Sequence, residues 1–275
     1  MQFSTPVEIE RPPFQIEPME QMMFVGSCFA SNIGQRFVNE KFRATVNPFG
    51  TMYNPASVLH TIERVSEPYR VVFITLGTNH VYRLRETGEI VDNCQKRPAA
   101  LFSEEKLTVG ECADYLQRAV LLLAERNPEV NVVFTVSPIR YRKYGYHGSQ
   151  LSKATLLLAI DQLLSSTHTS HQLPVTCHLH YFPAYEIFND ELRDYRYYAS
   201  DMLHPSEAAV DYLWEKITDN FLSPASRDFI AEWAPIRQAL AHRPLNGESA
   251  EYAAFMEKTM LKVAELQKKY PNFVL

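Results

Sequence analysis

Short apolar runs alternate along the chain with longer segments that have a helical pattern. The runs at residues 22–25, 70–76 and 131–136 each end at turn-forming residues, and residues 175–182 form a similar run. A short apolar run closed by a turn signal is typical of a strand that is buried on both faces. We therefore predict four buried strands.

The segments between these runs carry apolar residues at helical spacing. After the first run, Phe29, Ile33 and Phe37 share one stripe of a helix. We predict helices over residues 29–42, about 103–126, about 149–164 and from 206 past 217, and two further helical pieces after Pro224 that divide near residues 244–247.

Strands that alternate with helices predict a parallel sheet with helices on both faces. We expect a three-layer α/β/α sandwich of flavodoxin-like type over residues 1–223, with residues 224–275 as a helical C-terminal extension packed on it. Ligands of such sheets bind beyond the carboxyl ends of the strands. The functional site should therefore lie near the turns at residues 26–27, 77–79 and 137–138.

Composition and charge narrow the function classes. The chain has 275 residues, of which 46% are hydrophobic and 21% charged, so it is too apolar for a disordered protein. A formal net charge of -5 gives no support for nucleic-acid binding. No apolar stretch is long enough to span a membrane, and residues 1–17 lack the pattern of a signal peptide. The four cysteines show no CxxC pair, which favours reduced thiols and a cytoplasmic protein.

Ser27 follows the first predicted strand and precedes a predicted helix. At such a turn its hydroxyl would lie beside the unpaired N–H groups of the helix N-terminus, which can stabilise an oxyanion. Its neighbour Cys28 would point elsewhere, and we interpret it as a packed thiol. A serine at this position is, taken alone, more often a simple helix cap.

Asp201 and His204 are three residues apart, which lets a carboxylate and an imidazole stand on the same side of one turn. The carboxylate would then fix the imidazole tautomer and leave the other ring nitrogen as a general base. The alternative is a surface turn in which Asp201 caps the following helix.

Two further residues have the chemistry of oxyanion donors. Asn79 ends the second predicted strand and has a side-chain amide, and Gly50 lies in a turn where its backbone N–H could face a substrate. Each is an ordinary turn residue when considered separately.

Arg140, Tyr141 and Tyr144 follow the third predicted strand and combine a cation with aromatic rings. They could bind a sugar or an acidic acyl donor, although a solvated loop is the alternative. The histidine-rich stretch gives no such indication, because the spacing of its residues matches no zinc pattern. We expect no metal and no cofactor from these residues: His168, His171, Cys177, His178 and His180.

The order of Ser27, Gly50, Asn79 and the Asp201–His204 pair resembles the SGNH hydrolases, which are related to the GDSL esterases and lipases. Residues 26–30 (GSCFA) are the signature of the GSCFA family within that group. The resemblance extends over about residues 24–214 and includes the stretches 47–50, 53–55, 91–94, 134–138, 151–155, 181–186 and 201–205.

This resemblance implies a serine-dependent hydrolase that acts on ester bonds through a seryl acyl-enzyme. Ser27 would be the nucleophile, His204 the base and Asp201 its partner, while the N–H groups of Ser27 and Gly50 and the Asn79 amide would hold the oxyanion. The substrate would be a small-molecule or carbohydrate ester. A carbohydrate O-acyltransferase with the same site, or a non-catalytic binding module that retains the fold, are the alternatives.

Two geometric expectations follow. The Ser27 hydroxyl should lie within hydrogen-bond reach of a His204 ring nitrogen, at about 2.6–3.2 Å. A pocket at the carboxyl ends of the strands should be lined by Ser27, Gly50, Asn79 and part of residues 140–147.

Overall fold

A computed structural model describes residues 4–92, 94, 97–167, 176–243 and 249–275. Its centre is a five-stranded parallel sheet in the order β2-β1-β3-β7-β8. Numbered along the chain, these five strands have the order 2-1-3-4-5 of flavodoxin-like folds, so the predicted fold class is confirmed. The strands are β1 (Gln21–Gly26), β2 (Arg43–Val46), β3 (Val71–Leu76), β7 (Asn131–Val136) and β8 (His178–Tyr181).

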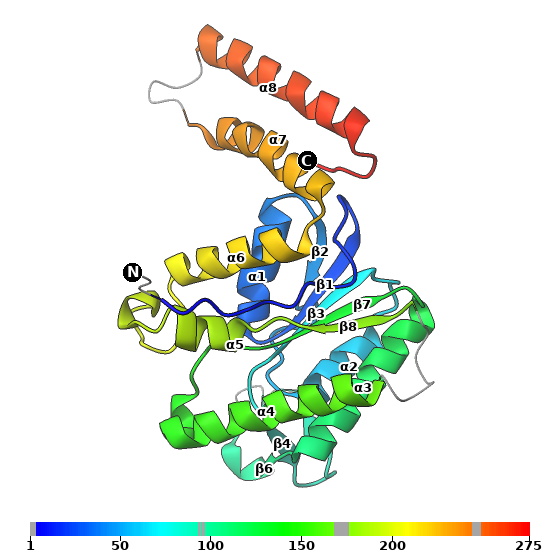
Figure 1. Ribbon diagram of the computed structural model, residues 1–275, viewed down its shortest axis with the longest axis vertical. Coiled ribbons are helices and arrows are strands. Elements are labelled where there is room, and N and C mark those ends of the chain that lie inside the picture. The colour runs from blue at the N-terminus through cyan, green and yellow to red at the C-terminus, as the bar shows by residue number, and fades with distance from the viewer. Residues whose placement is uncertain (1–3, 93, 95–96, 168–175, 244–248) are drawn as a thin grey trace.

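Helices cover both faces of this sheet, which completes the three layers (Figure 1). One face carries α1 (Cys28–Asn39) and α6 (Glu207–Phe221), and the other carries α2 (Pro55–Arg64), α3 (Val109–Arg126) and α4 (Gly145–Thr167). Short helical turns occur at Ala99–Leu101, Arg142–Tyr144, Ala184–Glu186 (α5), Ile187–Glu191 and Tyr195–Tyr197.

The alternation of side chains along each strand divides the core in two. In β1, Met22 and Phe24 face the α1 side while Met23 and Val25 face the α2 side, and all four are fully buried. Both faces are therefore apolar, which explains why the central strands appear in the sequence as continuous apolar runs.

Capping residues set the start of two helices. Asn54 caps α2 and Pro55 is its first residue, a favoured place for proline. The helix predicted over 103–126 begins only at Val109, where Thr108 and Glu111 form a capping box.

The residues before that helix form part of a small antiparallel sheet, which the apolar pattern did not predict. Its strands are β4 (His80–Leu84), β5 (Ile90–Val91) and β6 (Phe102–Lys106), in the order β5-β4-β6. Cross-strand ion pairs such as Arg83 with Glu105, at 2.7 Å, support this sheet. Its strands are too polar and too short to show the pattern of a buried strand.

The C-terminal segment forms α7 (Pro224–Ala241) and α8 (Ala250–Lys269), which extend from one end of the molecule (Figure 1). Phe229 and Trp233 of α7 are buried in the same apolar cluster as α1 and α6. The Phe229 ring lies 5.7 Å from that of Phe42 and 4.9 Å from that of Tyr270. None of the described helices has the length and apolar character needed to cross a membrane.

Replacing Phe229 with Ala should lower the free energy of unfolding by about 3–5 kcal/mol, because the ring is fully buried among other aromatic rings. The loss should appear in one cooperative urea transition, since α7 shares its core with the sheet. The control Phe255→Ala removes a ring that is 40% exposed and should cost less than about 1 kcal/mol. A separate early transition for α7 and α8 would contradict this view of the extension.

Candidate functional site

Ser27 is the N-cap of α1 and lies at the carboxyl end of β1. Its side chain is fully buried, and its Oγ accepts a hydrogen bond from the Phe29 N–H at 3.3 Å. Its own N–H donates to the Thr75 carbonyl at 3.0 Å, which continues the ladder between β1 and β3. The capping role, the simpler of the two interpretations of Ser27, is therefore present in the structure.

Gly26 sets the position of this serine. Its φ is +135°, and a Cβ at this residue would lie 2.0 Å from the Thr75 carbonyl oxygen, so only glycine fits. Its N–H donates to Asn47 Oδ1 at 2.9 Å, and Asn47 Nδ2 donates to the Ser31 hydroxyl at 2.8 Å. Asn47 therefore ties the end of β1 to the first turn of α1. The sequence placed Asn47 only in a motif that matches the family, with no role assigned.

Asp201 and His204 are in contact, as their spacing predicts. Asp201 Oδ2 lies 2.5 Å from His204 Nδ1, and Oδ1 accepts the N–H groups of Leu203 at 2.9 Å and His204 at 3.0 Å. The pKa of the Asp201 carboxyl lies well below its usual range because the carboxylate accepts hydrogen bonds. The donors are the His204 N–H, the His204 ring and the Leu203 N–H. This carboxylate therefore stays ionised beside the imidazole and leaves Nε2 available.

The turn that carries His204 lies against the first half of α1. Pro205, the next residue, lines a groove between α1 and α6 together with Ser31 and Asn32. An ion pair between Arg36 and Asp211 connects the same two helices. The chain thus brings Asp201 and His204 to the region of α1 that begins at Ser27.

The predicted hydrogen bond between Ser27 and His204 is not formed in this structure. Within the described part of the chain, Phe29 is the hydrogen-bond partner of the Ser27 hydroxyl, and Asp201 is that of the His204 ring. The His204 side chain is 42% exposed whereas Ser27 is fully buried. The capping bond uses the Ser27 hydroxyl only as an acceptor, so its own proton stays available, and the catalytic pairing stays a prediction.

The three predicted oxyanion donors are already engaged. The Ser27 N–H is bound to Thr75, the Gly50 N–H donates to the Asn47 carbonyl at 2.9 Å, and the Asn79 amide donates to the Leu107 carbonyl at 2.7 Å. The Ser27 N–H belongs to the ladder between two strands, and the Gly50 N–H closes a tight turn. The Asn79 amide anchors the small antiparallel sheet. The Asn79 amide has a second N–H, and the role of these three groups as oxyanion donors stays a prediction.

The three residues predicted to bind substrate fall into two groups, because the Tyr141 and Tyr144 rings stack at 6.2 Å while Arg140 faces another side. The Tyr144 ring stacks on His80 at 3.6 Å, next to the small sheet. The Tyr141 hydroxyl is buried over Gly77, where an added Cβ would lie 2.2 Å from it. Only Arg140 of the three lines a described cavity.

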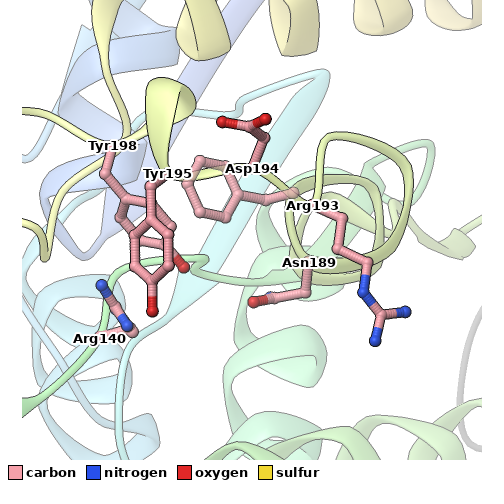
Figure 2. A pocket seen from close by; sticks show the side chains of 7 residues that line it. Arg140, Asn189, Arg193, Asp194, Tyr195 and Tyr198 are labelled. Atoms are coloured by element: carbon pink, nitrogen blue, oxygen red, sulfur yellow. The ribbon is translucent and has the colours of Figure 1, made fainter. Parts of the chain in front are cut away.

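That cavity has a volume of about 170 Å³ and is shown in Figure 2. It adjoins the turn of His204, because Arg140 donates its N–H to the Leu203 carbonyl at 3.2 Å and its guanidinium to the Met202 carbonyl. Ser27, Gly50 and Asn79 do not line this cavity, so a pocket lined by these three residues stays a prediction. The lining consists of Arg140, Phe188, Asn189, Arg193, Asp194, Tyr195 and Tyr198.

A buried lysine lies beneath the carboxyl ends of the central strands. Lys153 Nζ donates to the carbonyls of Gly77 and Ser137, each at 2.7 Å, and so joins the residues that follow β3 and β7. Burial lowers the pKa of this amine to about 7. The sequence indicated residues 151–155 as a family motif, but an isolated lysine in a helix gave no sign of burial.

The histidine-rich stretch is only partly described, since His168 and His171 lie outside the described residues. Within residues 4–92, 94, 97–167, 176–243 and 249–275, no group of three or more His, Cys, Asp or Glu side chains could hold a metal. All four cysteines are unpaired.

Replacing Gly26 with Ala should destabilise the protein by on the order of 3 kcal/mol, because the new Cβ meets the Thr75 carbonyl and the positive φ is strained. The matched control is Gly110→Ala in the first turn of α3, where nothing lies within 4 Å of the new Cβ. It should change stability by less than about 1 kcal/mol. Equal urea midpoints for the two variants would contradict the close approach at Gly26.

Lys153 should give a stability difference that depends on pH. Between about pH 7 and 10 the unfolded chain binds a proton at this amine, with an ordinary pKa of about 10.4, whereas the folded chain does not. The stability of the wild type minus that of Lys153→Met should therefore rise with pH over this range, by up to about 1.4 kcal/mol per unit. Urea unfolding at several pH values measures this, and a flat or falling difference would contradict a depressed pKa.

Comparison with known proteins identifies the family. Residues 21–70 and 67–217 match the model of the GSCFA family, and residues 233–275 match that of the GSCFA domain protein, C-terminal domain. None of the curated proteins matches the chain.

The chain is similar to several solved structures at low identity. A mutant acetyl esterase with acetate ion has 11% identity and a TM-score of 0.46, covering 78% of this chain and 99% of its own. A carbohydrate esterase family 3 from Talaromyces cellulolyticus has 10% identity and a TM-score of 0.42, covering 79% and 99%. A trans-2-enoyl-CoA reductase from Clostridium acetobutulicum in complex with NADH has 10% identity and a TM-score of 0.32, covering 88% and 76%. Since the family model spans most of the chain, this protein belongs to the GSCFA family.

Proposed function

We propose that this protein is a serine-dependent hydrolase of ester bonds, with Ser27 as nucleophile and His204 as base. The observation that carries the proposal is the Asp201–His204 contact, at 2.5 Å, on a turn whose next residue, Pro205, lines a groove together with residues of the helix begun by Ser27. Membership of a family whose signature surrounds Ser27 supports it. The order of these residues along the chain is that of the SGNH hydrolases.

The reaction begins when the Ser27 hydroxyl turns toward His204 Nε2. This movement gives up one capping hydrogen bond, which costs about 1 kcal/mol, and it releases the Phe29 N–H. His204 takes the hydroxyl proton as Ser27 Oγ attacks the ester carbonyl, and Asp201 stabilises the imidazolium.

The oxyanion is stabilised by the N-terminus of α1. The Phe29 N–H, released from Ser27, points to the place where the negative charge develops, and the helix dipole favours that charge. This donor replaces the engaged groups of Gly50 and Asn79. His204 then protonates the leaving alcohol, and water hydrolyses the seryl ester in a second step. No step uses a metal or a cofactor.

Two other functions use the same geometry. A carbohydrate O-acyltransferase would transfer the acyl group to a sugar instead of water, and the cavity beside His204 favours it as an acceptor site. A non-catalytic binding module is favoured by the burial of Ser27. The two experiments below separate an enzyme from a binding module, and a sugar acceptor added to the second assay separates transfer from hydrolysis.

A fluorophosphonate probe should label the wild type and fail to label Ser27→Ala, because the probe reacts with an activated serine. Ser31→Ala is the matched control, since Ser31 lies on the same turn of α1 but only accepts a hydrogen bond from Asn47. It should keep its labelling. Labelling that survives in Ser27→Ala, or is absent from the wild type, would contradict the proposed nucleophile.

Asp201→Asn should keep the fold but lower turnover by on the order of 10⁴, because the imidazole tautomer and the support of the imidazolium are lost. Turnover is measured on whichever nitrophenyl ester, from acetyl to octanoyl, the wild type hydrolyses. Asp228→Asn, an exposed carboxylate on α7, should be unchanged. A near-normal rate in Asp201→Asn would show that Asp201 and His204 form only a surface turn.

A further inference from the structure

The cavity in Figure 2 combines aromatic rings with groups that bind oxygen. Its lining includes the rings of Phe188, Tyr195 and Tyr198 and the guanidinium groups of Arg140 and Arg193. Its volume of about 170 Å³ is small and suits a single sugar ring better than a long acyl chain. We propose that this cavity binds a saccharide unit that carries a carboxylate.

Arg140 has a hydrogen-bond donor that no described residue satisfies. Its guanidinium stacks on the Tyr198 ring at 4.2 Å and donates to the Met202 carbonyl, but its Nε–H is buried without a partner. Buried donors are nearly always paired in native proteins. A small shift of the Arg140 side chain in the cavity wall would present this donor to an oxygen of a bound ligand.

The charge of the lining favours an anion. Arg193 is largely exposed and has only a long ion pair with Asp190, at 3.8 Å, so its guanidinium is available. The carboxylate in the lining, Asp194, is already engaged by Arg196, which donates from its side chain at 3.0 Å and from its N–H at 2.8 Å. Two guanidinium groups against one paired carboxylate leave a net positive cavity, and guanidinium matches carboxylate in geometry.

The remaining groups suit the neutral part of a sugar. Figure 2 shows the rings of Tyr195 and Tyr198 next to Arg140, with the Asn189 side chain across from them. Aromatic faces pack against the C–H face of a sugar ring. The Asn189 amide nitrogen donates to the Tyr185 carbonyl at 2.7 Å, which turns its oxygen into the free acceptor for a sugar hydroxyl.

The position of the cavity assigns this saccharide to the alcohol side of the ester, a point that rests on the proposed function. The Ala199 N–H donates to the His204 carbonyl at 2.8 Å, and Tyr198 pairs with Pro205, so the cavity wall continues into the turn of His204. Because His204 protonates the leaving alcohol, the alcohol lies on its side of the reacting carbonyl. The substrate class is then an acyl ester of an acidic saccharide.

Binding is tested with Ser27→Ala protein, which cannot turn the ligand over. Calorimetric titrations use methyl β-D-glucuronoside, the neutral methyl β-D-glucoside, and sodium acetate. Saturable binding of the glucuronoside, at least tenfold tighter than that of either other probe, is expected. Arg193→Gln should lower this affinity about tenfold, while Arg118→Gln, an exposed arginine on α3 outside the lining, should leave it unchanged. Circular dichroism checks that both variants fold.

Each other outcome overturns part or all of the proposal. Equal affinity for the glucoside and the glucuronoside would show that the site does not recognise the carboxylate. Acetate that binds as tightly as the glucuronoside would show that the site does not recognise the sugar. A lack of saturable binding, or binding that Arg193→Gln leaves unchanged, would show that this cavity is not the binding site. These titrations involve no catalysis, so their failure is distinguishable from the failure of the esterase proposal, which the fluorophosphonate probe decides.

Discussion

The close approach between Gly26 and the Thr75 carbonyl determines where β1 ends and where α1 begins. Because no side chain fits there, the backbone can turn sharply and still pair with β3, through the Ser27 N–H at 3.0 Å. β1 has its neighbours β2 and β3 on opposite sides, so the strand order reverses at this strand. Doubly wound sheets bind ligands at such a switch point. The glycine therefore places Ser27 at the one position of the sheet where the fold itself creates a site.

Polar groups below this turn hold the carboxyl ends of the strands together. Asn47 joins β1 to α1, and Lys153 joins the carbonyls of Gly77 and Ser137 beyond β3 and β7. An amine with two buried acceptors is satisfied even when it is neutral, which is consistent with its lowered pKa. These contacts give the site a rigid base, while His204 sits on an exposed turn above it. In this account catalysis requires that the buried Ser27 become accessible to substrate and that its hydroxyl turn toward His204.

The sequence was most informative where burial and backbone geometry act together. The three central strands β1, β3 and β7 were predictable because both of their faces are buried, and the Asp201–His204 contact because a separation of three residues favours proximity. The small antiparallel sheet was not, since its exposed strands carry charges. The hydrogen bonds of the predicted oxyanion donors and the residues that line the cavity were also beyond the sequence pattern. Which N–H is free, and which loops meet, depends on hydrogen bonds between segments far apart in the chain, as between Asn79 and Leu107.

The central claim is that Ser27 leaves its capping position, pairs with His204 and releases the Phe29 N–H to hold the oxyanion. A crystal structure of the fluorophosphonate adduct tests it most directly, because the phosphonyl oxygen occupies the place of the oxyanion. We expect phosphorus bonded to Ser27 Oγ, the phosphonyl oxygen accepting the Phe29 N–H at about 2.7–3.1 Å, and a His204 ring nitrogen within hydrogen-bond reach of the adduct. An adduct on another residue, or on Ser27 with its phosphonyl oxygen away from the α1 N-terminus and His204 out of reach, would contradict the account.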